Sequence, residues 1–104
     1  MDNQINILIV EDHLSYAQGM QFLLQQNPKI NEVNIAIDRN EALVKLEKNV
    51  VQIVLLDLQF DTTEYNGFTI AKKIKQLYPE IKIMVLTQHA RKGHHRRLFD
   101  ECGV

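Results

Sequence analysis

The sequence predicts a single α/β domain, a doubly wound parallel sheet with helices on both of its faces. From one end of the chain to the other, short apolar runs alternate with segments in which apolar residues recur at helical spacing. Right-handed crossovers through helices join parallel strands, so this alternation places helices on both faces of one sheet. The chain has 104 residues, 45% of them hydrophobic, which suits one core. We therefore interpret residues 1–104 as one domain.

Four strands are expected. Three are nearly continuous apolar runs, typical of strands buried on both faces of a parallel sheet. They are Ile5–Val10, Val50–Leu56 and Ile81–Leu86. The remaining strand, near residues 33–37, has an alternating pattern that is typical of a position nearer a sheet edge. Its apolar residues are Val33, Ile35 and Ile37, which alternate with Asn34 and Ala36.

Apolar residues at helical spacing predict three helices between the strands and a fourth after the last strand. Their stripes consist of Leu14, Ala17, Met20, Leu23 and Leu24; Ala42, Leu43 and Leu46; Ile70, Ala71, Ile74 and Leu77; and, within Arg91–Cys102, Leu98, Phe99 and Cys102. Asp38, with Glu41 three positions later, resembles a capping box and predicts the start of the second helix. The third helix is expected to follow Gly67 and to end before Pro79, because proline cannot continue the hydrogen-bond ladder. Gly103 suits the end of the fourth.

Three acidic residues and one threonine lie directly at the ends of predicted strands. Glu11 and Asp12 come after the first strand, Asp57 ends the third, and Thr87 follows the fourth. Ligands of such sheets bind at the carboxyl ends of the strands. Three carboxylates at one edge would repel one another unless a divalent cation offset their charge, and Mg²⁺ suits oxygen ligands best. Each acid alone could simply cap a helix, but their joint placement favours a metal site.

At these positions the sequence resembles the response-regulator receiver family. The motifs that carry the resemblance are Ile7–His13, Val54–Leu58, Asn66–Gly67, Met84–Thr87 and Cys102–Val104. It extends from Ile5 to Val104 and implies a flavodoxin-like sheet with strand order 2-1-3-4. The Glu-Asp-His start and the helix that follows it look like the branch whose receivers commonly carry a helix-turn-helix DNA-binding domain downstream.

The resemblance also implies roles for individual residues. Asp57 would accept a phosphoryl group from a sensor histidine kinase. Asp12 and Asp57 would bind Mg²⁺ directly, Glu11 through water and Gln59 through its backbone carbonyl. Thr87 would hydrogen-bond a phosphoryl oxygen and act as the switch. The domain would take part in its own phosphoryl transfer without being an independent enzyme.

The sequence departs from the family pattern in three places: the loop after Asp57, Gln88 and His89 just past Thr87, and the C-terminal end. The loop after Asp57 lacks the usual Met-Pro pair and is longer than the common spacing to Gly67. The family's fifth strand, with its phosphoryl-binding lysine, and its fifth helix are not found before Val104, and Lys92 is interpreted as a solvated residue. We therefore expect a C-terminally truncated receiver with an output domain or effector beyond residue 104. The uncovered edge of the fourth strand, Ile81–Leu86, favours a homodimer.

Composition limits the partners. The formal charge of -1 gives no whole-chain basic field, so direct nucleic-acid contact by this domain is not expected. The one basic cluster is interpreted as a solvated or partner-facing helix rather than a DNA or metal site. It consists of Arg91, Lys92, Arg96 and Arg97 with His89, His94 and His95. With a single cysteine and neither a signal peptide nor a long apolar run, the sequence indicates a cytoplasmic protein without membrane contact.

Two alternatives stay open. The first is a pseudo-receiver that binds partners without being phosphorylated. The second is a phosphatase or phosphotransferase with Asp57 as nucleophile, although such enzymes usually place a general acid where this chain has Gln59. A nucleotide-binding enzyme is disfavoured because no glycine-rich phosphate loop occurs.

Overall fold

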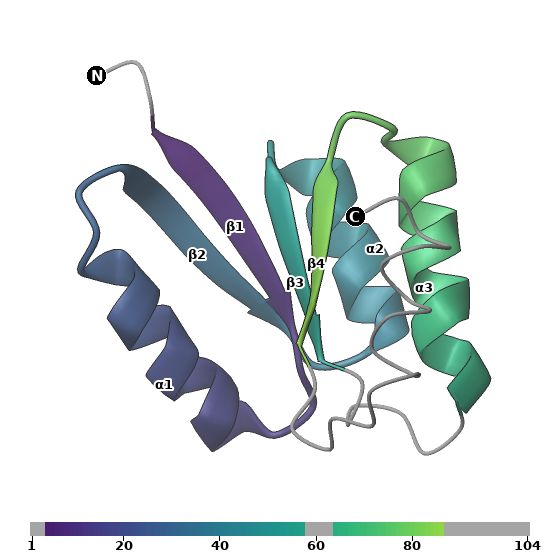
Figure 1. The fold of residues 1–104 in the computed structure, drawn as a ribbon, viewed down its shortest axis with the longest axis horizontal. Coiled ribbons are helices and arrows are strands. Elements are labelled where there is room, and N and C mark those ends of the chain that lie inside the picture. The colour runs from purple at the N-terminus through teal and green to yellow at the C-terminus, as the bar shows by residue number, and fades with distance from the viewer. Residues whose placement is uncertain (1–3, 58–63, 87–104) are drawn as a thin grey trace.

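The computed structural model describes residues 4–57 and 64–86 of the chain (Figure 1). Strands and helices alternate along it, as predicted. The elements are β1 (Ile5–Val10), α1 (Leu14–Gln25), β2 (Ile30–Ala36), α2 (Arg39–Lys48), β3 (Ile53–Asp57), α3 (Glu64–Leu77) and β4 (Lys82–Leu86). The predicted helix Arg91–Cys102 lies outside the described residues, as do Gln59 and Thr87.

The strands form one sheet in the order β2-β1-β3-β4, which confirms the predicted order 2-1-3-4. All three pairings are parallel. β2 lies at one edge, as its alternating pattern indicated. Because all the strands run in the same direction, their carboxyl ends meet at one edge of the sheet (Figure 1).

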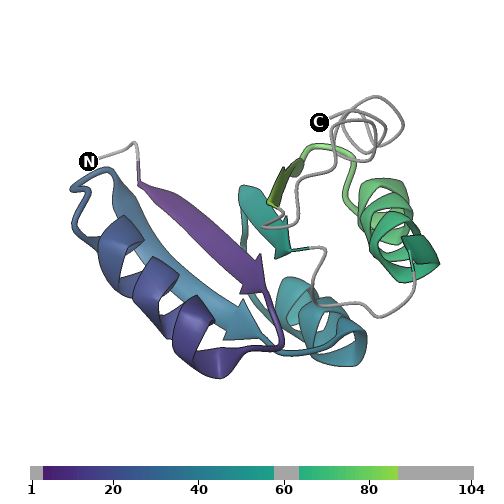
Figure 2. The ribbon, with the colours of Figure 1, turned by 60° about the horizontal axis from the view of Figure 1, so that its bottom comes forward.

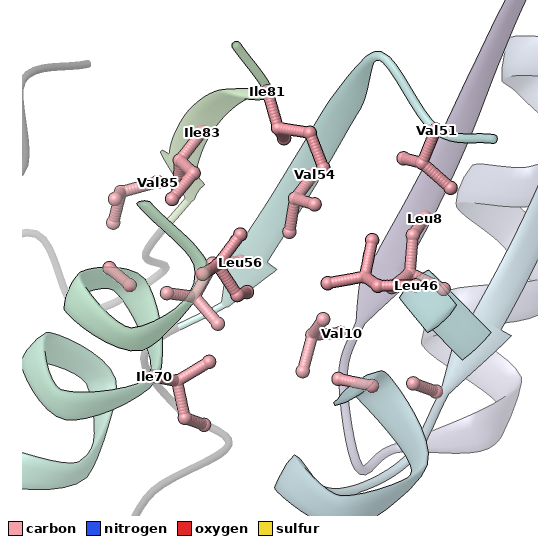
Figure 3. Close-up of a cluster of buried hydrophobic side chains, with 14 residues drawn as sticks. Leu8, Val10, Leu46, Val51, Val54, Leu56, Ile70, Ile81, Ile83 and Val85 are labelled. Atoms are coloured by element: carbon pink, nitrogen blue, oxygen red, sulfur yellow. The ribbon is translucent and has the colours of Figure 1, made fainter. Parts of the chain in front are cut away.

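Helices lie on both faces of the sheet (Figures 1 and 2). Successive side chains of a strand point to opposite faces, so each strand contributes to two cores. On one face α1 packs against a cluster formed by Ile7, Ile9, Ala17, Val33 and Leu55. On the other face α2 and α3 cover the larger cluster of Figure 3, whose labelled residues are Leu8, Val10, Leu46, Val51, Val54, Leu56, Ile70, Ile81, Ile83 and Val85.

The stripe predicted for α1 is only partly correct. Ala17 is buried, and Met20 and Leu24 are half-buried against the sheet, but Leu14 is 51% exposed and Leu23 is 69% exposed. The packed residues recur at helical spacing along one line, whereas Leu23 is rotated by about 100° from Leu24 and lies beside that line. Leu14 is the first residue of the helix. The contact between α1 and the sheet is therefore narrower than predicted.

The start of α2 agrees with the sequence analysis. Oδ1 of Asp38 accepts the backbone N–H of Glu41 at 2.8 Å. The Glu41 side chain accepts the N–H of Ile37 at 2.7 Å, one residue earlier than in a standard capping box. Asp38 is thus the N-cap of a helix that begins at Arg39.

The predicted start of α3 is wrong. The helix begins at Glu64 and includes Gly67 rather than following it. A single glycine inside a helix costs only about 1 kcal/mol relative to alanine, so it need not mark a boundary. The helix ends at Leu77, ahead of Pro79, as predicted. Ile70, Ala71 and Ile74 are buried, but Leu77 is exposed and is not part of the core.

The strand boundaries also shift. β3 begins at Ile53 instead of Val50, whose side chain is exposed, and β2 spans Ile30–Ala36, which leaves Ile37 outside the strand. Backbone pairing, not hydropathy, fixes these ends, so apolar residues in the adjoining turns were wrongly included. Met84 of β4 is 46% exposed, so this strand is not buried on both faces.

Candidate functional site

The registers of the parallel strands bring two of the predicted acids together. Val10 of β1 is the partner of Leu56 in β3, so the next residues, Glu11 and Asp57, lie side by side at the carboxyl edge. The backbone N–H of Glu11 donates to the carbonyl of Ala36 at 2.9 Å, which continues the pairing of β1 with β2 by one residue. The chain is thus still held by the sheet at the point where the acidic segment begins.

Both neighbouring acids are buried. Glu11 is 1% exposed and Asp57 is 3% exposed, and they are the buried charged residues among those the structure describes. Ile9 and Leu55, two positions earlier in each strand, belong to the cluster on the α1 face. By the alternation of strand side chains, Glu11 and Asp57 point to that same face. Burying two carboxyl groups side by side is unfavourable when both carry charge.

The Glu11 carboxyl is held from one side. Its Oε2 accepts a hydrogen bond from the backbone N–H of His13 at 2.8 Å. The ring nitrogen Nδ1 of His13 lies 2.8 Å from the same oxygen. Its Oε1 is buried and has no hydrogen-bond partner within the described part of the chain. Burial raises the pKa of Glu11 from the ordinary 4.5 to about 7; the Asp57 carboxyl also raises it, and the hydrogen bonds from His13 lower it.

Asp12 and His13 form the outer part of the site. Their side chains are 43% and 62% exposed, and Nδ1 of His13 lies 3.1 Å from Oδ1 of Asp12. The hydrogen bond that the His13 ring donates to Glu11, followed by the charge of Asp12, raises the pKa of His13 above its ordinary 6.5. One ligand atom from each of Glu11, Asp12 and His13 lies within 4.8 Å of the others, a spacing that could hold a metal ion.

The predicted site residues are therefore only partly brought together. Glu11 and Asp12 lie in one group, and Asp57 lies beside Glu11 but is not a member of the three-residue group. Leu86 of β4 is the partner of Asp57, and Thr87 is the next residue in sequence. Gln59 and Thr87 themselves lie outside the described residues.

His13 was not predicted as a site residue. Its place directly after Glu11-Asp12 at the end of a buried strand was the available signal. The sequence alone could not show that the ring turns back toward both carboxylates instead of pointing to solvent. In the structure the His13 ring supplies the nitrogen atom of the three-residue group that also includes Glu11 and Asp12.

The donor set fits a divalent cation. Two carboxylates supply hard oxygen ligands, and the buried Oε1 of Glu11 receives no hydrogen bond from a donor within residues 4–57 and 64–86, so a cation or its water could contact it. A cation would also offset the repulsion between the buried carboxyl groups of Glu11 and Asp57.

Comparison with known proteins identifies the class to which this fold and acidic edge belong. The family model of the response regulator receiver domain matches residues 7–103. This match covers nearly the whole chain, which therefore belongs to the response regulator receiver family. The resemblance inferred from the motifs is confirmed.

Particular relatives are transcriptional regulatory proteins. The chain is 28% identical over 88 residues to DegU of Brevibacillus brevis, and the match covers 85% of this chain and 36% of the relative. It is 30% identical over 88 residues to RcsB of Escherichia coli K12, covering 84% of this chain and 41% of RcsB. The chain thus spans about two fifths of the length of these relatives or less. They are regulators and not enzymes, which agrees with the prediction for this domain.

Solved structures agree with this assignment. The isolated receiver domain of RcsB from Salmonella enterica serovar Typhimurium, determined with the phosphomimetic BeF₃⁻, superposes with a TM-score of 0.83 at 27% identity, covering 95% of this chain and 72% of that one. RcsB bound to the promoter rprA gives a TM-score of 0.84 at 25% identity, covering 97% of this chain and 56% of that one.

Among the described residues, no helix is both long and apolar enough to span a membrane.

Proposed function

We propose that this chain is the phosphoacceptor receiver of a two-component response regulator and that Asp57 takes a phosphoryl group from a sensor histidine kinase in the presence of Mg²⁺. One observation above all supports this function. The chain belongs to the receiver family, and Asp57 is the last residue of the central strand β3. Its carboxyl group lies beside Glu11, at the sheet edge where ligands bind.

The transfer needs little covalent help from the protein. A carboxylate oxygen of Asp57 forms a bond to phosphorus while the bond between phosphorus and the donor's imidazole nitrogen breaks. The released imidazole takes up a proton from water. No general base is required, because a carboxylate oxygen attacks phosphorus without first losing a proton. The protein contributes positioning and neutralisation of charge on the phosphoryl oxygens.

Particular residues would hold the cation and the product. Asp12 and Asp57 would bind Mg²⁺ directly, Glu11 through water and Gln59 through its backbone carbonyl. When bound, Mg²⁺ supplies positive charge against the phosphoryl oxygens. The buried Oε1 of Glu11, which lacks a hydrogen-bond partner among the described residues, suits contact with a water of the ion. Thr87 would donate a hydrogen bond to a phosphoryl oxygen and move inward as the switch.

The output of the switch is proposed from the relatives. RcsB is described as bound to promoters in the presence of BeF₃⁻, and both RcsB and DegU are named transcriptional regulatory proteins. We infer that this receiver controls a DNA-binding output domain or effector in the cytoplasm. The formal charge of -1 supports a role in which the receiver itself does not contact DNA.

The experiment is phosphorylation by acetyl phosphate, followed by intact mass spectrometry after rapid quenching. The 104-residue protein with Mg²⁺ should gain one phosphoryl group, more slowly than a form that also carries the family's fifth strand with its lysine, and chelation of Mg²⁺ should greatly reduce the labelling. Asp57→Asn should abolish labelling and Asp12→Asn should reduce it by weakening metal binding. Glu80→Gln, which alters an exposed acid before β4, should behave as wild type. Without any labelling of the wild-type protein, the pseudo-receiver function would replace the present proposal.

A further inference from the structure

His13 has an unusual position for a surface histidine. Its side chain is 62% exposed, yet Nδ1 lies between the carboxylates that flank it, 2.8 Å from Oε2 of Glu11 and 3.1 Å from Oδ1 of Asp12. His13 is also the N-cap residue of α1, but its side chain makes no capping hydrogen bond. The ring is thus not used to stabilise the helix that it precedes.

These separations match the spacing of ligands around one ion. Metal–oxygen and metal–nitrogen bonds of divalent ions are about 2.1 Å long, so neighbouring ligands of an octahedral ion lie about 3.0 Å apart. The distances from Nδ1 to the two carboxylate oxygens fall on either side of that value. In the structure the 2.8 Å separation from Oε2 of Glu11 is a hydrogen bond, so replacing the Nδ1 proton by an ion needs only a small movement of the exposed ring.

A second observation points to a ligand at this group. The side chain of Glu11 is 99% buried, since its exposure is 1%, and its Oε1 receives no hydrogen bond from a donor in the described part of the chain, whereas the carboxyl group of Asp57 lies beside Glu11. Two buried carboxyl groups at one edge repel each other when both are ionised, and a bound cation would offset that charge. The other oxygen of the same carboxyl group is the one that contacts His13.

We propose that the His13 imidazole is a nitrogen ligand of the metal site at Glu11 and Asp12, so that this site binds first-row transition-metal ions more tightly than Mg²⁺. The inference rests on the metal site of the proposed function, adds His13 to it and, for a transition-metal ion, has Oε2 of Glu11 bind the ion directly instead of through water. Imidazole suits transition-metal ions, whereas Mg²⁺ takes oxygen ligands almost alone. His13 would therefore decide which ion the receiver carries.

The ligand exchange is balanced in a simple way. The Nδ1 proton of His13 leaves to solvent, and the Nδ1 lone pair then binds the ion. The backbone N–H of His13 can keep its hydrogen bond to Oε2 of Glu11, because that bond does not involve the ring. No change of oxidation state is needed.

The test uses Cu²⁺ as a paramagnetic probe bound to the 104-residue protein, because imidazole is a preferred ligand of this ion. Pulsed electron paramagnetic resonance should detect ¹⁴N coupling from one directly bound imidazole in the wild-type protein. His13→Gln should abolish that coupling. It should also weaken Zn²⁺ binding by on the order of tenfold or more while changing Mg²⁺ affinity much less. The substituted side chain is exposed and forms no helix cap, so circular dichroism should show an unchanged fold.

A matched control addresses the remaining histidines. A variant with His89, His94 and His95 all replaced by Gln should retain the wild-type ¹⁴N coupling. Coupling that survives His13→Gln, or Cu²⁺ bound without any ¹⁴N coupling, would refute the role of His13. If Mg²⁺-dependent labelling of Asp57 persists in either case, the proposed receiver function stands and only the additional ligand is wrong. Absence of both metal binding and labelling would overturn the two proposals together.

Discussion

At the scale of single residues, Glu11 has the most clearly unfavourable electrostatic environment among the described residues. Its carboxyl group is buried beside Asp57, and burial raises its pKa to about 7. In the proposed function these carboxylates hold a cation, and without a bound cation their arrangement opposes folding when the groups are ionised. The proposed site would therefore lower the stability of the protein when no cation is bound.

The raised pKa of Glu11 predicts that the stability of the protein depends on pH when a chelator keeps the site free of metal. Between about pH 4.5 and about pH 7, folded Glu11 keeps a proton that unfolded Glu11 has lost, so rising pH favours unfolding. The raised pKa of His13 acts in the same direction, because its stabilising contribution is lost as pH rises through the folded value. Urea unfolding at a series of pH values should show the free energy of unfolding falling over this range, with Glu11 contributing on the order of 3 kcal/mol.

Glu11→Gln is the variant that isolates the effect. It should flatten most of the pH dependence, because an amide does not titrate but can still accept the N–H of His13. Glu47→Gln, at an exposed position of α2, should keep the wild-type slope. If the free energy of unfolding changes with pH equally in wild type and Glu11→Gln, Glu11 does not cause the pH dependence.

Sequence reasoning found the acids but not the shape of the site. Glu11, Asp12 and Asp57 were predicted because each follows or ends a recognisable apolar strand, and the register of β1 with β3 then brings Glu11 to Asp57. The orientation of the His13 ring depends on a side-chain rotation that no periodicity encodes. Which acids share one group depends on spacings of a few ångströms, and these come only from the folded backbone.

At the scale of elements, local signals with a hydrogen-bonding mechanism were the most dependable. The Asp38 cap located the start of α2, and Pro79 located the end of α3. Hydropathy alone was less exact: it included Val50 in β3 and Leu23 in the packed stripe of α1, although both side chains are exposed. An apolar side chain shows what could be buried, whereas strand pairing and helix orientation decide what is buried.

The Asp38 cap can be tested directly. Asp38→Ala removes the acceptor of the Glu41 N–H and should lower the free energy of unfolding by about 1 kcal/mol in urea titrations. Asp38→Asn should retain most of the stability, because asparagine is an equally good N-cap. Asn40→Ala serves as the control within the same helical turn and should have a smaller effect. If Asp38→Ala is as stable as wild type, the hydrogen bond does not contribute as described.

At the scale of the whole molecule, the two edges of the sheet differ. β2 forms one edge and carries polar residues such as Asn31, Glu32 and Asn34. β4 is the other outer strand of the described sheet, and its Met84 is 46% exposed. An exposed apolar outer strand favours pairing with another chain. This observation supports the homodimer expected from the sequence.

We expect the protein to self-associate through β4. Light scattering coupled to size exclusion should give a mass above the 12.1 kDa of the monomer, and the mass should rise with concentration. Met84→Lys places a charge on the outer strand and should shift the protein toward the monomer. Val50→Lys, at an exposed apolar residue between α2 and β3, should leave the association unchanged. A monomer at every concentration would exclude association through β4.

The central claim is that Asp57 is the phosphoacceptor, and site-specific trapping tests it most directly. Acyl phosphates are reduced by borohydride, which converts a phosphorylated aspartate to homoserine. After treatment with acetyl phosphate and Mg²⁺, peptide mass spectrometry should find homoserine at position 57, with loss of the signal when Mg²⁺ is chelated. Homoserine at another aspartate, or none in protein that is folded and supplied with Mg²⁺, would contradict the account.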